Sequence, residues 1–241
     1  METLDMVRAV DGPMGKAGAA FYFHPDTLAK GKELGLDGFR FYVLGRAGVM
    51  GDVPPRVVES AFGYFARPLI EKIYGSAQEL MAPAEASAAY FACAGELGRK
   101  ALGGVDGLDA YVAAAEKVVA AARPAGLPLF AGIAAMELDD DVAGRALQLT
   151  AVLRELRGSV HLVAVTAVGL DDHVAHAIRR PDDVATFGYP EPPTITDEDR
   201  AKLAQADALT DRLLLGPYGV LDGAEAEALV AGADAIAAAV T

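Results

Sequence analysis

Four side chains that bind anions or transfer protons lie close together in the second half of the sequence. They are Arg154, Glu155, Arg157 and His161. A helix would place Arg157 and His161 on one face because they are four residues apart, and it would make Arg154 a neighbour of Arg157. Guanidinium groups pair with carboxylate, sulfate or phosphate, and histidine transfers protons near neutral pH. The spacing therefore predicts an anion pocket with a titratable base, or alternatively a structural cluster that fixes a helix turn.

A further arginine, Arg46, lies in an otherwise apolar segment of the first half, four residues after Tyr42. A guanidinium in such a segment reaches solvent, pairs with a carboxylate or faces a cavity. One interpretation is an ion pair of Arg46 with Glu59 or Asp52. The other is that Arg46 faces a ligand cavity.

Two other histidines, His173 and His176, lie beside acidic residues. Zinc-binding histidines on a helix are usually four residues apart, whereas these are three apart, and Asp172 is better placed to cap a helix. The single cysteine, Cys93, excludes a metal site with several thiolates. The glycine-rich motifs that hold nucleotides are absent from the sequence. We therefore expect neither a metal nor another cofactor.

The elements that carry these residues are predicted to be helices. Alanine supplies 49 of the 241 residues, and no long segment alternates apolar and polar residues with the period of a strand. Prolines and glycines mark the ends of several predicted helices. Thr196, which is followed by acidic residues, predicts an N-cap. The clearest predicted helices span residues 83–102, 108–122, 197–215 and 223–240.

The two halves of the chain share a pattern. Gly-Ala-Ala at 18–20 and Gly-Ile-Ala at 132–134 are each expected inside a helix, and an amphipathic segment follows each of them. A short apolar helix between two glycine turns comes next in both halves, the second of them beginning at a turn at Arg157-Gly158. The pattern predicts an all-α fold of two pseudo-repeated helical units packed about a pseudo-twofold axis, with a C-terminal helical segment.

The predicted units comprise residues 1–124 and 125–241. Their short apolar helices are expected to pack against each other at the pseudo-axis, where a polar side chain must be paired or line a cavity. Small-molecule sites are common between such units, so we expect the main cavity there. Its expected lining is Tyr42, Arg46, Arg157 and His161, with Phe21 or His24 closing one side.

The expected roles of these residues follow from their chemistry. Arg46, Arg154 and Arg157 would hold the anion, because the planar guanidinium matches the geometry of an oxyanion. His161 or Glu155 would transfer a proton.

Composition narrows the class of partner. The formal net charge is −13, which disfavours binding to a phosphate backbone. No apolar run reaches the ~18–20 residues that a membrane span requires, and no basic stretch precedes an apolar one at the start of the sequence. We therefore expect a cytoplasmic protein that binds a small anionic metabolite rather than nucleic acid or a membrane. A homodimer and a heteromeric biosynthetic complex are both left open.

Several segments resemble an actinobacterial family of SalK-like helix-turn-helix proteins. They are residues 38–51, with the motif Gly45-Arg46-Ala47, residues 129–135, residues 210–230, and residues 153–169, with the motif Leu153-Arg154-Glu155-Leu156-Arg157-Gly158-Ser159-Val160-His161. The resemblance implies a helical fold with a winged helix. The chain departs from the family at Leu156, where the motif has a histidine. It also departs between Arg180 and Thr210, where a Pro-rich segment without tryptophan replaces the winged helix.

Three functional hypotheses follow. The first is a cofactor-independent enzyme of specialised metabolism, of the lyase, cyclase or transferase type, that binds an anionic metabolite and uses acid–base or elimination–cyclisation chemistry. The second is a ligand-sensing helix-turn-helix transcription regulator, which the resemblance implies and the acidic net charge opposes. The third is a non-catalytic partner subunit of a biosynthetic complex.

Overall fold

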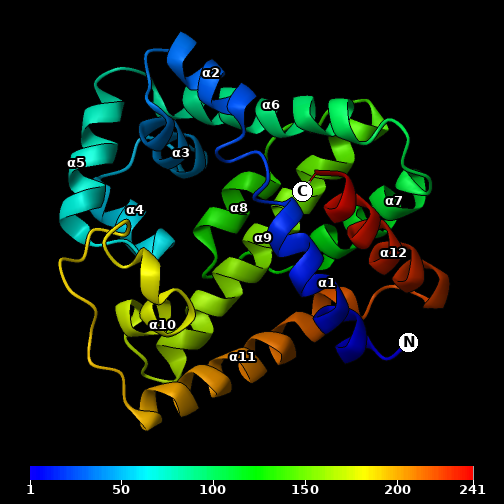
Figure 1. The fold of residues 1–241 in the computed structure, drawn as a ribbon. Helices are drawn as coiled ribbons and strands as arrows, with labels where there is room; N and C mark the ends of the chain where they lie inside the picture. Colours follow the sequence, from blue (N-terminus) through cyan, green and yellow to red (C-terminus); the bar gives the residue numbers. More distant parts are fainter. Residues whose placement is uncertain (241) are drawn as a thin grey trace.

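The computed structural model describes residues 1–240, and within this range every regular element is a helix (Figure 1). This confirms the predicted all-α class. Two short 3-10 helices, η1 (Gly48–Met50) and η2 (Pro181–Asp183), accompany the α-helices. The α-helices are α1 (Thr3–Ala17), α2 (Pro25–Glu33), α3 (Gly38–Ala47), α4 (Pro55–Phe62), α5 (Arg67–Gln78), α6 (Pro83–Ala101), α7 (Leu108–Ala121), α8 (Pro128–Ala134), α9 (Val142–Ala167), α10 (Asp172–Arg179), α11 (Asp197–Tyr218) and α12 (Gly223–Val240).

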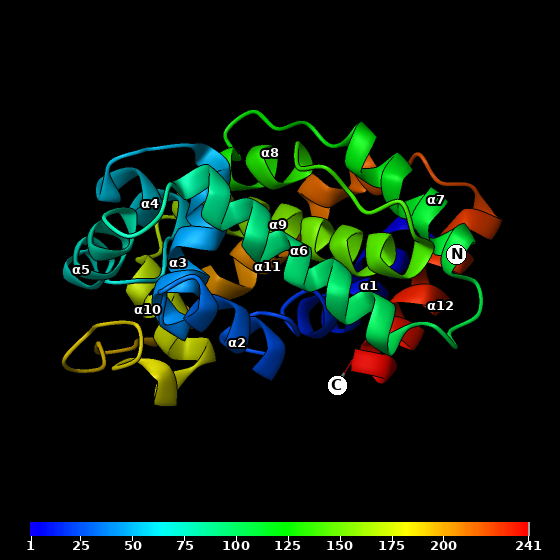
Figure 2. The same cartoon turned by 90° about the horizontal axis from the view of Figure 1, so that it is seen from above.

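Helix α9 is the central element of the fold. It is 26 residues long, and the Asp141 side chain caps its first turn by accepting a hydrogen bond from the Gly144 amide at 2.8 Å. Helices α1, α6, α7, α8 and α11 all pack against it. Figures 1 and 2 show α3, α4, α5 and α10 toward one end of α9, and α7 and α12 toward the other. Side chains from both ends of the chain therefore converge on a single helix.

The predicted glycine turn at Arg157-Gly158 is wrong, because α9 continues through it to Ala167. A lone glycine costs a helix only about 1 kcal/mol relative to alanine. The residues on either side of it bury apolar side chains, including Leu156 and Val160, against the core. This burial outweighs the cost of the glycine. The second half therefore contains one long helix where the first half has the separate ten-residue helix α3.

The other part of the predicted repeat also differs from the structure. Gly18 ends α1, so residues 18–20 lie in a turn rather than inside a helix, whereas Gly132 lies within α8 as expected. One hydrophobic core cluster includes Tyr74 of α5, Tyr111 of α7 and Leu147 of α9. The pseudo-twofold axis and the units 1–124 and 125–241 remain predictions.

The predicted ends of most helices are confirmed. Helices α6, α7 and α12 match their predicted ranges to within one residue. Thr196 caps α11 through a capping box, in which its hydroxyl accepts from the Asp199 amide at 3.2 Å and the Asp199 carboxylate accepts from the Thr196 amide at 2.9 Å.

Two details at helix ends differ from expectation. Helix α11 includes Pro217 and ends at Tyr218, because the buried Tyr218 ring anchors the last turn. The N-cap of α10 is Asp171 rather than Asp172, and its carboxylate accepts from the amides of His173 and Val174 at 2.9 and 3.2 Å.

Among residues 1–240, no helix combines the length and the apolar character needed to cross a bilayer.

Candidate ligand-binding site

A cavity of about 620 Å³ lies between α3, α4, α9 and α10. This volume falls within the range typical of small-molecule sites. We call it the aromatic cavity, and define it by the residues that line it: Ala19, Tyr22, Phe23, Phe39, Tyr42, Arg46, Ala61, Phe62, Tyr64, Phe65, Leu129, Arg154, Glu155, Gly158, Ser159, Leu162, Ala175, His176, Arg179, Arg180, Asp183, Thr186 and Phe187.

Aromatic rings form much of the wall of this cavity. The Tyr42 ring of α3 stacks on Phe23 and on Phe39, with centroids 5.1 and 5.9 Å apart. Phe65 lies beside these rings, with its centroid 6.2 Å from that of Tyr42, and it stacks on Phe187 with centroids 4.2 Å apart. Flat rings arranged in this way favour a ligand with a flat apolar body.

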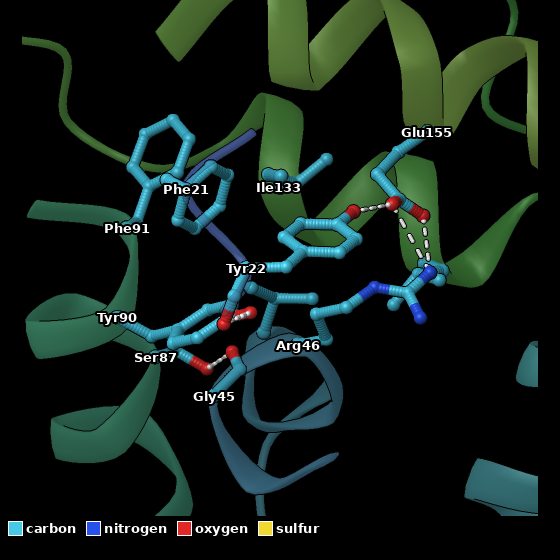
Figure 3. Close-up of a pocket in the computed structure, with 11 residues that line it drawn as sticks. Phe21, Tyr22, Gly45, Arg46, Ser87, Tyr90, Phe91, Ile133 and Glu155 are labelled. Carbon is cyan, nitrogen blue, oxygen red and sulfur yellow. Dashed lines mark hydrogen bonds and ion pairs between the residues drawn. The ribbon is translucent and has the colours of Figure 1, made fainter. Parts of the chain in front are cut away.

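A buried network of charged groups forms one wall. Figure 3 shows three of its members, Tyr22, Arg46 and Glu155. Arg46 of α3 donates through Nη2 to both carboxylate oxygens of Glu155 on α9, at 3.0 and 2.9 Å. Tyr22 donates to Glu155 Oε1 at 2.6 Å. Arg154 Nη1 donates to the same oxygen and to the Tyr22 hydroxyl, each at 2.8 Å.

The environment of Glu155 keeps it ionised. Burial by itself raises the pKa of this carboxyl, but the charges of Arg46 and Arg154 and the hydrogen bonds from Arg46 and Tyr22 outweigh it. The result is a pKa lowered to about 2. An acid this strong is a poor proton acceptor at neutral pH, so Glu155 is suited to positioning the arginines.

The two arginines of the network differ in what they can offer a ligand. Arg46 is 13% exposed, and its Nη1 donates to the Tyr42 hydroxyl at 2.6 Å while Nη2 is taken by Glu155. Its guanidinium also lies 4.5 Å from the Phe62 ring centroid. Arg154 is 28% exposed, and its Nε and Nη2 make no hydrogen bond within residues 1–240. Arg46 keeps a buried Nε without a hydrogen-bond partner in the same range, so Arg154 is the more exposed of the two arginines and the one with two unpaired donor nitrogens.

The electrostatic balance of the cavity is opposite to that of the whole chain. Its lining contains four arginines and two carboxylates, giving a local charge of 4 − 2 = +2, whereas the chain carries −13. Arg179 pairs with Asp207 of α11, and Arg180 lies 3.6 Å from Asp183. A partly enclosed site with an excess of positive charge favours an anion.

His176 of α10 is a residue that sequence reasoning did not assign to a site. It is 5% exposed and lines the aromatic cavity, and its buried Nε2 has no hydrogen-bond partner within residues 1–240. Its ring lies 3.8 Å from that of Phe187, between centroids. Burial and the charge of Arg180 lower its pKa, so it is neutral at physiological pH and can accept a proton. The signal that could have found it is the spacing of His173, His176 and Arg179, three residues apart along one short helix.

The predicted site residues lie in four separate places in the structure. Tyr42, Arg46, Arg154 and Glu155 meet at the aromatic cavity. Phe21 lies behind that wall, beside a space of about 20 Å³ that is the size of one water molecule (Figure 3). His24 caps α2, with Nδ1 accepting from the Asp26 amide at 3.3 Å. Arg157 and His161 lie in a fourth place, where α9 packs against α1 and α11.

The expectation that Arg157 and His161 share the aromatic cavity with Arg46 is wrong, because neither residue lines it. His161 faces Thr210 of α11 instead, and the position of Arg157 follows from helical phase. Successive residues of an α-helix are about 100° apart, so Arg157 lies about 200° around α9 from Glu155. Gly158 and Leu162 share the cavity side with Glu155 instead. The expected ion pairs of Arg46 with Glu59 or Asp52 are also absent from the described residues, because Glu155 occupies the guanidinium.

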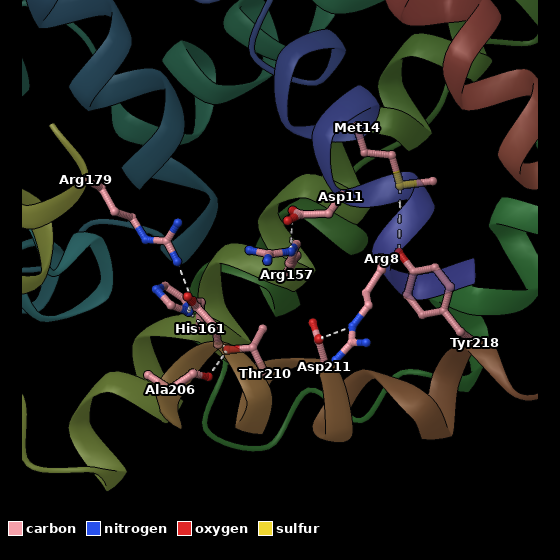
Figure 4. Close-up of polar contacts among 11 residues, drawn as sticks. Arg8, Asp11, Met14, Arg157, His161, Arg179, Ala206, Thr210, Asp211 and Tyr218 are labelled. Atoms are coloured by element: carbon pink, nitrogen blue, oxygen red, sulfur yellow. Dashed lines mark hydrogen bonds and ion pairs between the residues drawn. The ribbon is translucent and has the colours of Figure 1, made fainter. Parts of the chain in front are cut away.

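The far side of α9 carries a separate polar cluster (Figure 4). Arg157 pairs with Asp11 of α1. His161 Nδ1 lies 3.0 Å from the Thr210 hydroxyl of α11 and 3.7 Å from Asp207. Burial, with a smaller contribution from the charge of Arg179, lowers the pKa of His161 to about 4. His161 is therefore a neutral buried group that ties α9 to α11.

Both histidines of α10, His173 and His176, contact aromatic rings. His173 stacks on Tyr189 with centroids 3.5 Å apart. Within residues 1–240 no group of three or more His, Cys, Asp or Glu side chains has an arrangement that could hold a metal ion.

Comparison with known proteins supplies a family. A search of the curated proteins found no match, and a search of the solved structures found none. The model of a helix-turn-helix family matches residues 7–187, which is well over half of the chain and includes most of α1 and all of α2 to α10. The chain belongs to this helix-turn-helix family.

Proposed function

We propose that this helix-turn-helix family protein binds a small organic anion with a flat apolar body in the aromatic cavity. The observation that carries the proposal is the combination of stacked rings and excess arginine in one cavity of about 620 Å³. The rings would hold the flat body. The unpaired Nε and Nη2 of Arg154 would hold the negative group, since charge-assisted hydrogen bonds to an oxyanion are stronger than neutral ones.

In its enzymatic form, the proposal is cofactor-independent acid–base chemistry on such an anion. His176 would take or give the proton, in place of the predicted His161, because His176 lines the cavity and its Nε2 has no hydrogen-bond partner in the part of the chain that the structure describes. A general base must reach the proton that it removes, and His161 does not line the aromatic cavity. A substrate from specialised metabolism is consistent with the resemblance of the sequence to SalK-like actinobacterial proteins.

Membership of the helix-turn-helix family favours a second candidate, a ligand-sensing regulator. Helices α9 and α10 are joined by a short turn at residues 168–171. Helix α10 contributes His176 and Arg179 to the aromatic cavity, so a bound ligand would contact the second helix of this pair directly. The net charge of −13 opposes binding to DNA.

Binding can be tested with 1-anilinonaphthalene-8-sulfonate, a flat aromatic sulfonate whose fluorescence rises in an apolar site. The variant Arg154→Met keeps the apolar stem and removes the charge, and should weaken binding about tenfold, which corresponds to about 1.4 kcal/mol. The matched control is Arg200→Met, because Arg200 is exposed and remote from the cavity lining. Equal affinity of Arg154→Met and wild type would contradict the proposed site.

The two candidates are separated by further measurements. Compounds found by screening aromatic acids for thermal stabilisation would be tested for turnover, and His176→Gln should abolish turnover while leaving probe affinity within about twofold. A regulator should instead bind a mixed-sequence duplex at about 50 mM salt, with an affinity that changes when the ligand is added. Binding without turnover and without DNA affinity would contradict both candidates.

A further inference from the structure

A second cavity, of about 450 Å³, lies between α1, α9 and α11. We call it the basic cavity, and its lining is Val7, Val10, Asp11, Gly12, Met14, Gly15, Lys16, Ala19, Leu153, Arg154, Arg157, Gly158, Arg180, Leu214 and Tyr218. Four of these residues also line the aromatic cavity: Ala19, Arg154, Gly158 and Arg180. The two cavities therefore adjoin along this shared border.

The lining of the basic cavity contains more cationic than anionic side chains. Its cations are Lys16, Arg154, Arg157 and Arg180, and its one carboxylate is Asp11. Arg154 is also paired with Glu155, and Arg180 lies 3.6 Å from Asp183. Asp11 is paired with Arg157. Lys16 is exposed and has no ion pair or side-chain hydrogen bond within residues 1–240. Lys16 is therefore the cation of this cavity without a carboxylate partner in that range, and with the arginines beside it the cavity favours an anionic group.

The border between the cavities is open at Gly158. This glycine lies on α9 and is exposed, and a Cβ atom added there would have no neighbour within 4 Å. The two arginines at the border, Arg154 and Arg180, come from α9 and from the end of α10. A ligand can therefore extend along α9 past Gly158 while remaining in contact with guanidinium groups.

We propose that the ligand has two parts: a flat body in the aromatic cavity, and a phosphate-bearing arm that passes Gly158 and lies against Lys16 and Arg157 in the basic cavity. This inference rests on the proposed function, because it assumes that the aromatic cavity holds the body. Phosphate is the chemistry of choice for the arm, since arginine binds it through two parallel hydrogen bonds and lysine as a point charge. Arms of this kind occur in coenzyme A thioesters and in nucleotides.

The test uses displacement of 1-anilinonaphthalene-8-sulfonate by matched pairs of compounds. One pair is benzoyl-coenzyme A and S-benzoylpantetheine, and the other is flavin mononucleotide and riboflavin. Within each pair the body is the same and only the phosphate-bearing part differs. For at least one pair, the phosphate-bearing member should displace the probe at a concentration at least about tenfold lower than its partner. The pair that responds identifies the source of the arm.

Variants with matched controls test whether the phosphate-bearing part of the ligand lies in the basic cavity. Lys16→Ala should reduce the advantage of the phosphate-bearing member by at least about threefold and leave probe affinity unchanged. Lys32→Ala is the control, because Lys32 is exposed, also lies in the last turn of its helix, and borders neither cavity. Gly158→Leu should block the passage and abolish the advantage, whereas Gly158→Ala should retain it.

The outcomes separate the two proposals. If the probe does not bind in the aromatic cavity, the proposed function and the arm both fail. If the probe binds but neither phosphate-bearing compound displaces it at a lower concentration than its partner, only the proposal of a phosphate-bearing arm is contradicted. An advantage that survives both Lys16→Ala and Gly158→Leu would also overturn the arm, because the phosphates would then lie elsewhere.

Discussion

Arg46 and Glu155 form a buried ion pair across 109 residues of sequence, with the Arg46 Nη2 nitrogen 2.9 Å from the nearer carboxylate oxygen. Arg46 lies in the last turn of α3 and Glu155 in the middle of α9. The pair therefore joins the helices of the N-terminal half to the central helix, and it holds in place the wall of the aromatic cavity from which Arg154 offers its free donors.

Replacing Glu155 with alanine is expected to lower the free energy of unfolding by about 3–5 kcal/mol, because Arg46 and Arg154 would be left as buried charges without their anion. Urea denaturation monitored by circular dichroism measures the change. Glu59→Ala breaks an ion pair in which Arg67 is 49% exposed, and should cost less than about 1 kcal/mol. Similar small losses in both variants would contradict the role given to Glu155.

The stability of the protein should fall at acidic pH through Glu155. The pKa of Glu155 is about 2 in the folded protein, below its ordinary value of 4.5. The stabilisation is therefore present above about pH 4.5 and is lost as the pH falls toward 2, by about 3 kcal/mol in total. Denaturation curves between pH 6 and 2.5 should show a steeper decline for wild type than for Glu155→Gln, and parallel curves would contradict the shift.

His161 should remain neutral across the physiological range. Its pKa of about 4 lies below the ordinary value of 6.5, so its contribution to stability is present above about pH 6.5 and is lost as the pH falls toward 4. The ring proton signals of His161 in NMR, assigned by their loss in His161→Gln, should not shift between pH 8 and about 5.5. A midpoint near 6.5 would contradict the burial of this side chain between α9 and α11.

Two glycine substitutions should have opposite effects. Gly158→Ala lies inside the continuous helix α9 with open space around its Cβ, and should stabilise the protein by about 0.5–1 kcal/mol. Gly48→Ala would drive its Cβ into the backbone carbonyl of Pro83 at the start of α6, and should destabilise it by about 1–3 kcal/mol. Thermal unfolding compares the two, and destabilisation by Gly158→Ala would indicate a helix break at that position.

Local features of the sequence determined the helical class and most helix ends. The high alanine content, the proline that begins α6 and the Thr196 cap of α11 all act over a few residues, so their consequences can be predicted without knowing the fold. The same local rule places Arg157 and His161 on one side of α9, as their spacing predicts. The sequence predicts a turn at Gly158, but the helix continues there. The helical cost of the glycine is offset by burial of neighbouring residues against helices distant in the sequence.

Tertiary packing decided which side of α9 faces the cavity. Periodicity groups the residues of a helix by face, but the partner of each face is set by contacts between segments far apart in the chain. Packing of α3 on α6, which itself packs on α9, joined Arg46 to Glu155. Packing of α10 on α9 brought His176 into the aromatic cavity. Packing of α1 and α11 against the other side of α9 paired Arg157 with Asp11 and placed His161 within hydrogen-bond distance of Thr210. Those long-range contacts, rather than any local propensity, separated residues that lie together in the sequence.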